Sequence, residues 1–300
     1  MAIRIATFNV ENLFARYKFR ANFNPLSADG FTVNDTAFED LSEAGKQRLT
    51  AAAIREVNAD IIGLQEADSL NGLDHFNSLY LGGLRYQHRI LIDSHDPRHI
   101  DVAVLSRLPI VSIRTYRHER NDQGNEFRFS RDCLVADADS NGKTLTLFVN
   151  HFKSMLGGRD QTKKKRVEQA KRVAALVDER FAAVNFNANF VVLGDLNDYI
   201  DPKTGIRDIV EHPGVENVLN RLLEADRWTH YFKGQNEYRQ LDYLLLSKGL
   251  AQQNQGQPQV MRKGLPFRAD RYDGPRFDGV GFDNPKSSDH APLFMDVDLL

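Results

Sequence analysis

The sequence predicts an α/β fold, a sandwich of mixed, largely antiparallel sheets formed by a single domain of 300 residues. Strand-like segments recur along the whole chain, and helix-like segments lie between them. Only three long helices are expected, which are too few to cover both faces of a doubly wound parallel sheet. The composition, with 41% hydrophobic and 27% charged residues, is typical of a globular protein.

Hydrophobic periodicity assigns the individual elements. Strands are predicted at residues 3–10, 60–64, 102–106, 144–150, 190–193, 241–246 and 293–299, and helices at 42–57, 160–184 and 215–225. Ser42 can cap the first helix, and the second has one apolar stripe that includes Val173 and Val177. Two long turn-rich stretches remain, 14–39 and 252–286, and loops of that length usually serve function.

Several protein classes are excluded by composition. The longest apolar runs are far shorter than the roughly 20 residues of a membrane span, so no membrane partner is expected. Met1 is followed almost at once by a strand pattern, which leaves no room for a secretion signal and predicts a cytoplasmic protein. The single Cys133 excludes an internal disulfide and a cysteine zinc cluster. With a net charge of -2, a polyanion must be held by local basic patches or bound metal.

Six polar clusters lie at the ends of predicted strands, where packing does not require them. Each cluster alone could be a turn, but six together indicate a shared site. If they converge, the site holds carboxylates, amides and imidazoles without a thiolate, which suits Mg²⁺ or Mn²⁺ and disfavours zinc. Phosphodiester hydrolysis needs such groups for charge neutralisation, water activation and leaving-group protonation. The candidates are Asn9, Asn12, Glu66, His151, Asp195, Asn197, Asp242, Asp289 and His290.

The same clusters resemble the motifs of the endonuclease/exonuclease/phosphatase superfamily, which includes pancreatic deoxyribonuclease, apurinic endonucleases, bacterial sphingomyelinases and inositol polyphosphate phosphatases. The similarity covers nearly the whole chain and is nearest to bacterial nuclease-like members. It implies a four-layer α/β sandwich with the active site at one end of two packed sheets. In chain order, the motifs are Thr7-Phe8-Asn9-Val10-Glu11-Asn12, Leu64-Gln65-Glu66, Asn150-His151-Phe152-Lys153-Ser154, Gly194-Asp195-Leu196-Asn197, Leu241-Asp242-Tyr243 and Ser288-Asp289-His290.

The resemblance also implies a role for each matching residue. Glu66 would be the principal metal ligand with Asn9 beside it, and Asp289 would lie at this metal or at a second one. Asp195 would position the attacking water, and Asn197 would contact the scissile phosphate.

The two histidines of the motifs would act on either side of the phosphate. His290, oriented by Asp242, would be the general base or would polarise the phosphate. His151 would serve the leaving group, although base and acid could be exchanged between these histidines. Apurinic endonucleases carry a tyrosine where His151 falls and a tryptophan shortly before the aspartate that Asp242 matches. The chain has Arg239 and Gln240 before Asp242, which argues against an abasic-site enzyme.

Basic residues supply weaker candidates for substrate binding. Lys163, Lys164, Lys165 and Arg166 lie in the first turns of a predicted helix, where the helix dipole disfavours cations. They either contact phosphates that flank the cut or form a solvated surface run. Arg128, like Arg107 and Arg131, is either a phosphate clamp or an ion-pair partner. The candidates for substrate binding are therefore Asn12, Lys153, Lys163, Lys164 and Arg128.

Three loop patterns have two interpretations each. Residues 16–20 mix basic and aromatic side chains, which could stack on bases or anchor the loop. Asp-Gly and Asp-Asn pairs at 273–284 could bind Ca²⁺, although turn formation is favoured because the spacing does not match an EF-hand. His95 and His99, among three aspartates, suggest a further metal site or ordinary loop polarity.

The sequence thus predicts a phosphodiesterase that depends on Mg²⁺ or Mn²⁺, with Ca²⁺ possible. The expected reaction is hydrolysis of DNA or RNA by in-line attack of water, as an endonuclease or exonuclease. A phosphatase or lipid-headgroup phosphodiesterase acting on a small phosphate ester is the alternative, and a non-catalytic binding module is a third hypothesis. Nucleic acid is the expected partner, and no protein partner follows from the sequence.

Overall fold

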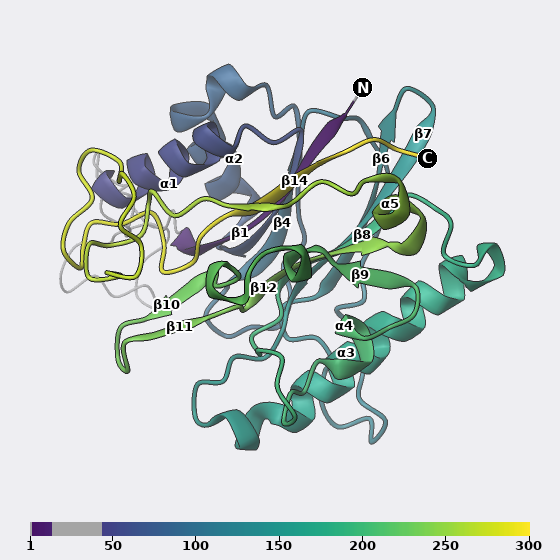
Figure 1. Cartoon of the computed structure of the whole chain (residues 1–300). Coiled ribbons are helices and arrows are strands. Elements are labelled where there is room, and N and C mark those ends of the chain that lie inside the picture. Colours follow the sequence, from purple (N-terminus) through teal and green to yellow (C-terminus); the bar gives the residue numbers. More distant parts are fainter. Residues whose placement is uncertain (1, 14–43) are drawn as a thin grey trace, which may run out of the picture.

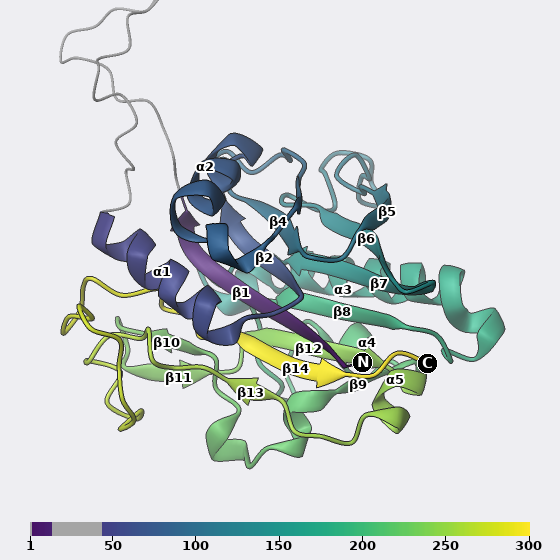
Figure 2. The same cartoon turned by 90° about the horizontal axis from the view of Figure 1, so that it is seen from above.

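The computed structural model describes residues 2–13 and 44–300. Two six-stranded sheets pack face to face between helices (Figures 1 and 2). The first sheet has the strand order β13-β14-β1-β2-β4-β3, and the second has the order β5-β6-β7-β8-β12-β9. A separate two-stranded sheet pairs β10 with β11.

Both large sheets are mixed and largely antiparallel. Among the described strands, β1 and β2 are the only parallel pair of the first sheet, and β7 and β8 are the only parallel pair of the second. The first sheet comprises β1 (Ile3–Leu13), β2 (Ile61–Ala67), β3 (His88–Leu91), β4 (Asp101–Ser106), β13 (Gln259–Val260) and β14 (Leu293–Val297). The second comprises β5 (Ile110–Arg114), β6 (Cys133–Ser140), β7 (Lys143–His151), β8 (Phe190–Asp195), β9 (Val215–Asn217) and β12 (Asp242–Ser247), and the small sheet is β10 (His230–Phe232) with β11 (Glu237–Arg239).

Helices form the outer two layers of a four-layer sandwich. The helices α1 (Ala44–Val57) and α2 (Leu70–Tyr80) cover the first sheet, and α3 (Arg159–Phe181) covers the second (Figure 1). The short helices α4 (Arg207–Val210) and α5 (Lys248–Gln253) lie in connections of the second half. The predicted fold class is therefore confirmed.

Alternation along the strands explains why the layers pack. On β8, Leu193 points between the two sheets, whereas its neighbour Val192 packs against α3. On β1, Ile5 points between the sheets and Phe8 packs under α1 and α2. Because side chains alternate with a period of two, each buried strand contributes to two apolar layers.

All seven predicted strands are present, and two of the three predicted helices are. The predicted helix at 215–225 is wrong. This segment forms β9, which pairs with β12 at the sheet edge, and then the 3₁₀ turns η4 (Val218–Arg221) and η5 (Glu224–Asp226). The side chain of Asn217 accepts a hydrogen bond from the backbone N–H of Leu219 and starts the first turn. The stretch 14–39, with its basic and aromatic residues 16–20, lies outside the described residues.

Helix length and polarity bear on membrane association. Among the described residues, no helix is both long and apolar enough to cross a membrane.

Candidate active site

The strand ends that carry the predicted site residues converge where the two sheets meet. Asn9 on β1 of the first sheet donates a side-chain hydrogen bond of 3.0 Å to Oδ2 of Asp195 on β8 of the second. The sheet register places Asp195 opposite both His151 on β7 and Asp242 on β12. Backbone pairing thus brings three motifs side by side, and one hydrogen bond joins them to the other sheet.

Asp195 lies at the centre of this arrangement and is almost fully buried. Its carboxylate accepts hydrogen bonds from the backbone N–H of Asn197 at 2.8 Å and from the Asn197 side chain at 2.9 Å. Nε2 of His151 lies 3.5 Å from its Oδ2, and Nε2 of His290 lies 3.8 Å from the same oxygen. Burial raises the pKa of Asp195 above the usual aspartate value, although His290 opposes the shift.

His290 is oriented by Asp242 through the ring nitrogen that faces away from Asp195. Nδ1 of His290 lies 2.8 Å from Oδ2 of Asp242, which also accepts a 2.6 Å hydrogen bond from the Thr229 hydroxyl. Burial opposes protonation of His290, but Asp242 and Asp195 outweigh it and raise its pKa well above the usual histidine value. Asp242 therefore orients the ring of His290 and favours its protonated form, with Nε2 turned toward Asp195.

His151 differs from His290 in its surroundings. Its Nε2 faces Asp195 and lies 3.8 Å from Oε1 of Glu66, while its Nδ1 is buried without a hydrogen-bond partner among the described residues. Burial, reinforced by Arg131, lowers the pKa of His151 well below the usual histidine value. The pKa values of the two histidines are thus shifted in opposite directions although both face Asp195.

Glu66 and Asp289 are the acidic residues that the sequence predicts as metal ligands. Glu66 lies at an irregularity of β2 with a left-handed backbone, φ +68°. Burial and the nearby Asp289 raise the pKa of Glu66. A buried carboxylate whose charge is destabilised by a neighbouring acid fits a site that takes up a divalent cation. The amide oxygen of Asn9 accepts a hydrogen bond from the backbone N–H of Glu11, so the predicted role of Asn9 as a ligand remains a prediction.

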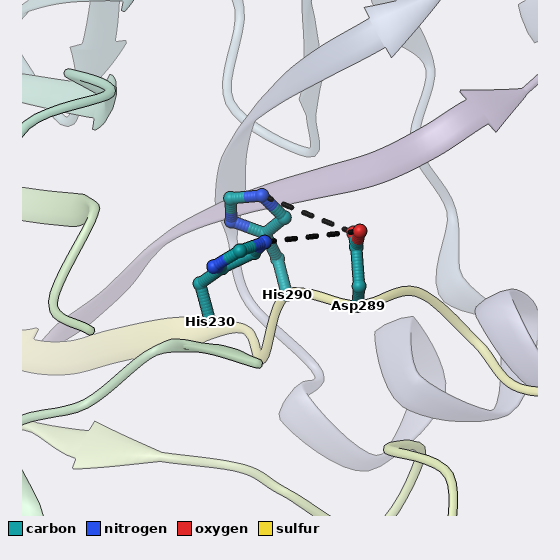
Figure 3. Close-up of side chains that lie close together, drawn as sticks. All are labelled: His230, Asp289 and His290. Atoms are coloured by element: carbon teal, nitrogen blue, oxygen red, sulfur yellow. Dashed lines mark ion pairs between the residues drawn. The ribbon is translucent and has the colours of Figure 1, made fainter. Parts of the chain in front are cut away.

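His230 on β10 was not predicted and joins the site (Figure 3). Its Nε2 lies 3.8 Å from Oδ2 of Asp289, and its ring centroid lies 4.5 Å from that of His290. His230, Asp289 and His290 could together hold a metal ion, as could Asp195, Asp242 and His290. No local pattern distinguishes His230 in the sequence, because a backbone bridge between His230 and His290 creates its proximity.

The predicted substrate-binding residues lie in two different places. Asn12 is near the end of β1 with φ +63°, and the backbone of Lys153, just beyond His151, is anchored to α3 by Gln169. Arg128, Lys163 and Lys164 line a separate cavity of about 650 Å³ that includes none of the predicted catalytic residues.

The basic run itself divides between exposed and buried positions. Arg166 is fully buried and paired with Asp198, so the expected phosphate contact is wrong for this residue. Lys165 pairs with Glu126 at 3.2 Å.

The two loop patterns suspected of binding further metals have protein partners. Asp96 pairs with Arg131 at 2.8 Å, and the ring of His95 stacks on Phe127. Asp283 pairs with Lys233 at 2.9 Å. Within residues 2–13 and 44–300, neither pattern forms a group suited to hold a metal ion.

Gly194 sets the close approach of β7 and β8 beside Asp195. Its φ is +132°, and an added Cβ would lie 1.9 Å from the carbonyl oxygen of Asn150. We therefore expect Gly194→Ala to lower the free energy of unfolding by about 2–4 kcal/mol, measured by urea denaturation. Gly279→Ala is the matched control, because Gly279 also has positive φ but no atom within 4 Å of the added Cβ. Equal losses in both variants would contradict a steric cause.

Solved structures with the same fold come from animals and bacteria. The human nocturnin catalytic domain is 16% identical, with a TM-score of 0.64 over 100% of this chain and 95% of that one. An endonuclease/exonuclease/phosphatase from Bacteroides vulgatus is 15% identical, with a TM-score of 0.62 and complete coverage of both chains. TDP2 from D. rerio, complexed with a single-strand DNA product, is 15% identical with a TM-score of 0.61 over 99% of each chain.

The sequence comparison identifies the family. No curated protein matches the sequence. The sequence profile of the endonuclease/exonuclease/phosphatase family, by contrast, matches residues 4–295. This match confirms the family predicted from the six motifs. The chain belongs to the endonuclease/exonuclease/phosphatase family, whose members are phosphoric ester hydrolases that use divalent metal ions.

Proposed function

We propose that this protein is a metal-dependent phosphodiesterase that hydrolyses a nucleic acid strand by in-line attack of water. The observation that carries the proposal is the meeting of Asn9, His151 and His290 around the Asp195 carboxylate. The raised pKa of the buried Asp195 carboxylate suits it to accept a proton, and the raised pKa of the neighbouring His290 suits it to donate one, so the site supplies both groups. The single-strand DNA product bound to D. rerio TDP2, which shares the fold, supports nucleic acid as the substrate class.

Each catalytic residue has a role that follows from its contacts. Asp195 orients the attacking water and accepts its proton, because burial favours the protonated carboxyl. Nδ2 of Asn197 donates to Asp195 at 2.9 Å and to the Phe152 carbonyl at 3.1 Å, which holds the side chain beside Asp195, where we expect the phosphate. His290 donates a hydrogen bond to a phosphate oxygen from Nε2, and His151 lies beside the leaving oxygen, which takes up a proton from His290 or from solvent water.

Glu66 and Asp289 would hold a divalent cation, with Asn9 next to them. When bound, Mg²⁺ or Mn²⁺ would neutralise charge on the non-bridging phosphate oxygens. Backbone contacts keep these residues in place: the N–H of Asp289 donates to Oε2 of Glu11 at 2.9 Å, and the Ser288 hydroxyl donates to the Asn9 carbonyl at 2.7 Å.

A panel of substrates tests the proposed function against the alternative of a small phosphate ester. Supercoiled plasmid, a labelled single-stranded RNA and bis-p-nitrophenyl phosphate are incubated with Mg²⁺ or Mn²⁺. We expect at least one polymer to be cleaved with a far higher kcat/KM than the small diester. Turnover of the small diester alone would contradict the nuclease and favour a phosphatase or headgroup phosphodiesterase.

Metal binding gives a further prediction. Glu66→Gln removes an anionic ligand without changing side-chain size, so we expect Mn²⁺ affinity to fall at least about tenfold in isothermal titration calorimetry. The matched control is Glu56→Gln, because Glu56 is a surface residue paired with Lys263. EDTA should abolish hydrolysis by the wild-type protein. Equal Mn²⁺ affinity in both variants would place the metal elsewhere.

A further inference from the structure

His230 is the histidine of the site that none of the six motifs contains, and its ring faces Asp289 (Figure 3). We propose that His230 is a nitrogen ligand of the divalent ion held at Asp289, and that it makes the site prefer a transition-metal ion, such as Mn²⁺ or Co²⁺, over Mg²⁺. The proposal rests on the proposed function, because it concerns the metal of the same site.

Backbone hydrogen bonds on both sides of His230 fix its place beside Asp289. The N–H of Tyr231 donates to the carbonyl of Asp289 at 3.0 Å. The N–H of Ala291 donates to the carbonyl of Thr229 at 2.7 Å. Pairing of β10 with β11 holds the other edge of the strand. The imidazole therefore reaches the carboxylate from a backbone that is held on both edges.

The separation of the two side chains fits two ligands of one ion. At 3.8 Å, Nε2 of His230 and Oδ2 of Asp289 are too far apart for a direct hydrogen bond. Two ligands of an octahedral ion with bonds of about 2.1 Å lie about 3.0–4.2 Å apart. The observed distance falls within this range. The side chain of Asp289 is also 33% exposed, so an ion can reach it from solvent.

The two oxygens of Asp289 face different histidines. Oδ2 faces His230, whereas Oδ1 lies 3.9 Å from Nε2 of His290. The same Nε2 of His290 lies 3.8 Å from Asp195, where the proposed function places the phosphate. We therefore assign the metal ion to the Oδ2 side with His230, and the phosphate contact to His290.

Packing alone does not explain an imidazole at position 230. The centroid of the ring lies 4.5 Å from that of His290 and 6.5 Å from that of Phe232, and a phenyl ring would pack there equally well. In the described part of the chain, Nδ1 of His230 is buried without a hydrogen-bond partner, and Nε2 approaches Asp289 without bonding to it. Because buried polar groups normally have partners, a nitrogen in this position suits a ligand that lies between it and the carboxylate.

The charge around His290 also favours a cation at this place. The carboxylates of Asp242, Asp195 and Asp289 lie 2.8, 3.8 and 3.9 Å from its ring nitrogens. One imidazolium cannot balance three carboxylates. A divalent ion beside Asp289 would reduce the excess of negative charge without displacing His290.

An imidazole ligand changes which ion the site prefers. Mg²⁺ takes oxygen ligands and gives up its waters reluctantly, so an imidazole adds little to its binding. Transition-metal ions accept imidazole nitrogen, and their affinity for such a site rises from Mn²⁺ to Co²⁺. The motif residues alone suit Mg²⁺ and Mn²⁺ alike, and His230 shifts the preference toward Mn²⁺ and Co²⁺.

Nitrogen ligation can be detected directly by pulsed EPR of bound Mn²⁺. The metal-free protein is loaded with Mn²⁺ without substrate, and the spin-echo modulation by nitrogen is recorded. We expect nitrogen modulation in the wild-type protein and none in His230→Phe, which keeps a ring at this position. His230→Gln keeps a polar side chain, should also lack the modulation, and serves if the first variant unfolds. His88→Phe is the matched control and should retain the signal, because His88 lies on β3 at the edge of the first sheet.

Calorimetric titrations measure the ion preference. We expect His230→Phe to weaken the binding of Mn²⁺ and Co²⁺ at least about tenfold and that of Mg²⁺ less than about twofold. Equal losses for all three ions would overturn the ligand role, because they would show that the variant only disturbs Asp289. Nitrogen modulation that persists in both His230 variants would come from another histidine and would also overturn it.

Neither measurement needs a substrate, so the metal ligand and the nuclease can fail separately. A wild-type protein that cleaves nucleic acid but shows no nitrogen modulation would overturn His230 as a ligand and leave the nuclease intact. Nitrogen modulation in a protein that cleaves no strand would contradict the nuclease and retain the ligand. A wild-type protein that binds neither Mn²⁺ nor Co²⁺ would overturn both.

Discussion

Asp195→Ala is expected to lower kcat by at least about a thousandfold, because it removes the only carboxylate that both site histidines approach within 4 Å from Nε2 in the described structure. The loss should appear in kcat more than in KM, since the carboxylate acts on the attacking water. Steady-state kinetics on the best substrate of the panel measure it.

Two further variants distinguish a catalytic from a structural loss. Asp195→Asn keeps the side-chain volume and should be nearly as inactive. Asp296→Asn changes a surface carboxylate that pairs with Arg4 and should retain full activity. The free energy of unfolding should fall in Asp195→Ala by less than about 2 kcal/mol, because the buried carboxylate itself is costly. Activity within tenfold of wild type would refute the assigned role.

Asp198→Ala is expected to give the largest loss of stability, about 3–5 kcal/mol in the free energy of unfolding. Asp198 has no exposed surface and accepts hydrogen bonds from Nε of Arg166 at 3.0 Å and Nε of Arg159 at 2.7 Å. Removal of this carboxylate leaves the fully buried charge of Arg166 with neutral acceptors only, such as Thr162 and the carbonyl of Lys153. Urea denaturation measures the loss.

The control for this variant changes another aspartate that pairs with the same helix, α3. Asp201 also pairs with Arg159, at 2.6 Å, but its side chain is 30% exposed. Asp201→Ala should therefore cost less than about 1 kcal/mol. Similar losses in the two aspartate variants would contradict the argument from burial. The buried pair also positions the site, because Asp198 follows Asn197 and Arg166 holds the loop of Lys153.

The core strands and the polar residues that converge on Asp195 could be predicted because their signals are local. Alternating apolar residues mark each buried strand, and Asp195 or His151 stands out as a polar residue that ends an apolar run. Residues of this kind can be recognised in the sequence without knowledge of long-range contacts. The six motifs predicted that these residues lie close together. The structure shows that the parallel pairing of β7 with β8 places His151 opposite Asp195.

Elements set by tertiary contacts could not be predicted. β6 lacks a simple apolar pattern, because Asp137 and Asp139 interrupt it. Asp137 is tolerated because Arg180 of α3 neutralises its charge and Thr146 of β7 donates a hydrogen bond to it. At 215–225, pairing of β9 with β12 overrides a helical pattern. His230 joins the site only because β10 bridges to His290.

The basic run shows the same limit at a single helix. Lys163, Lys164, Lys165 and Arg166 look equivalent in sequence, but the period of the helix turns them to different faces. Lys163 and Lys164 line a surface cavity, whereas Arg166 points inward to Asp198. Charge alone could not distinguish a phosphate contact from a structural ion pair.

The most direct test of the active site compares wild-type protein and Asp195→Asn in one assay on oligothymidylate and single-stranded RNA, with Mg²⁺, Mn²⁺ or EDTA. The account predicts cleavage by the wild-type protein with metal, none with EDTA, and none by the variant under any condition. Cleavage that survives in EDTA or in Asp195→Asn would contradict a metal-dependent site at Asp195, as would a wild-type protein that cleaves neither strand with either metal.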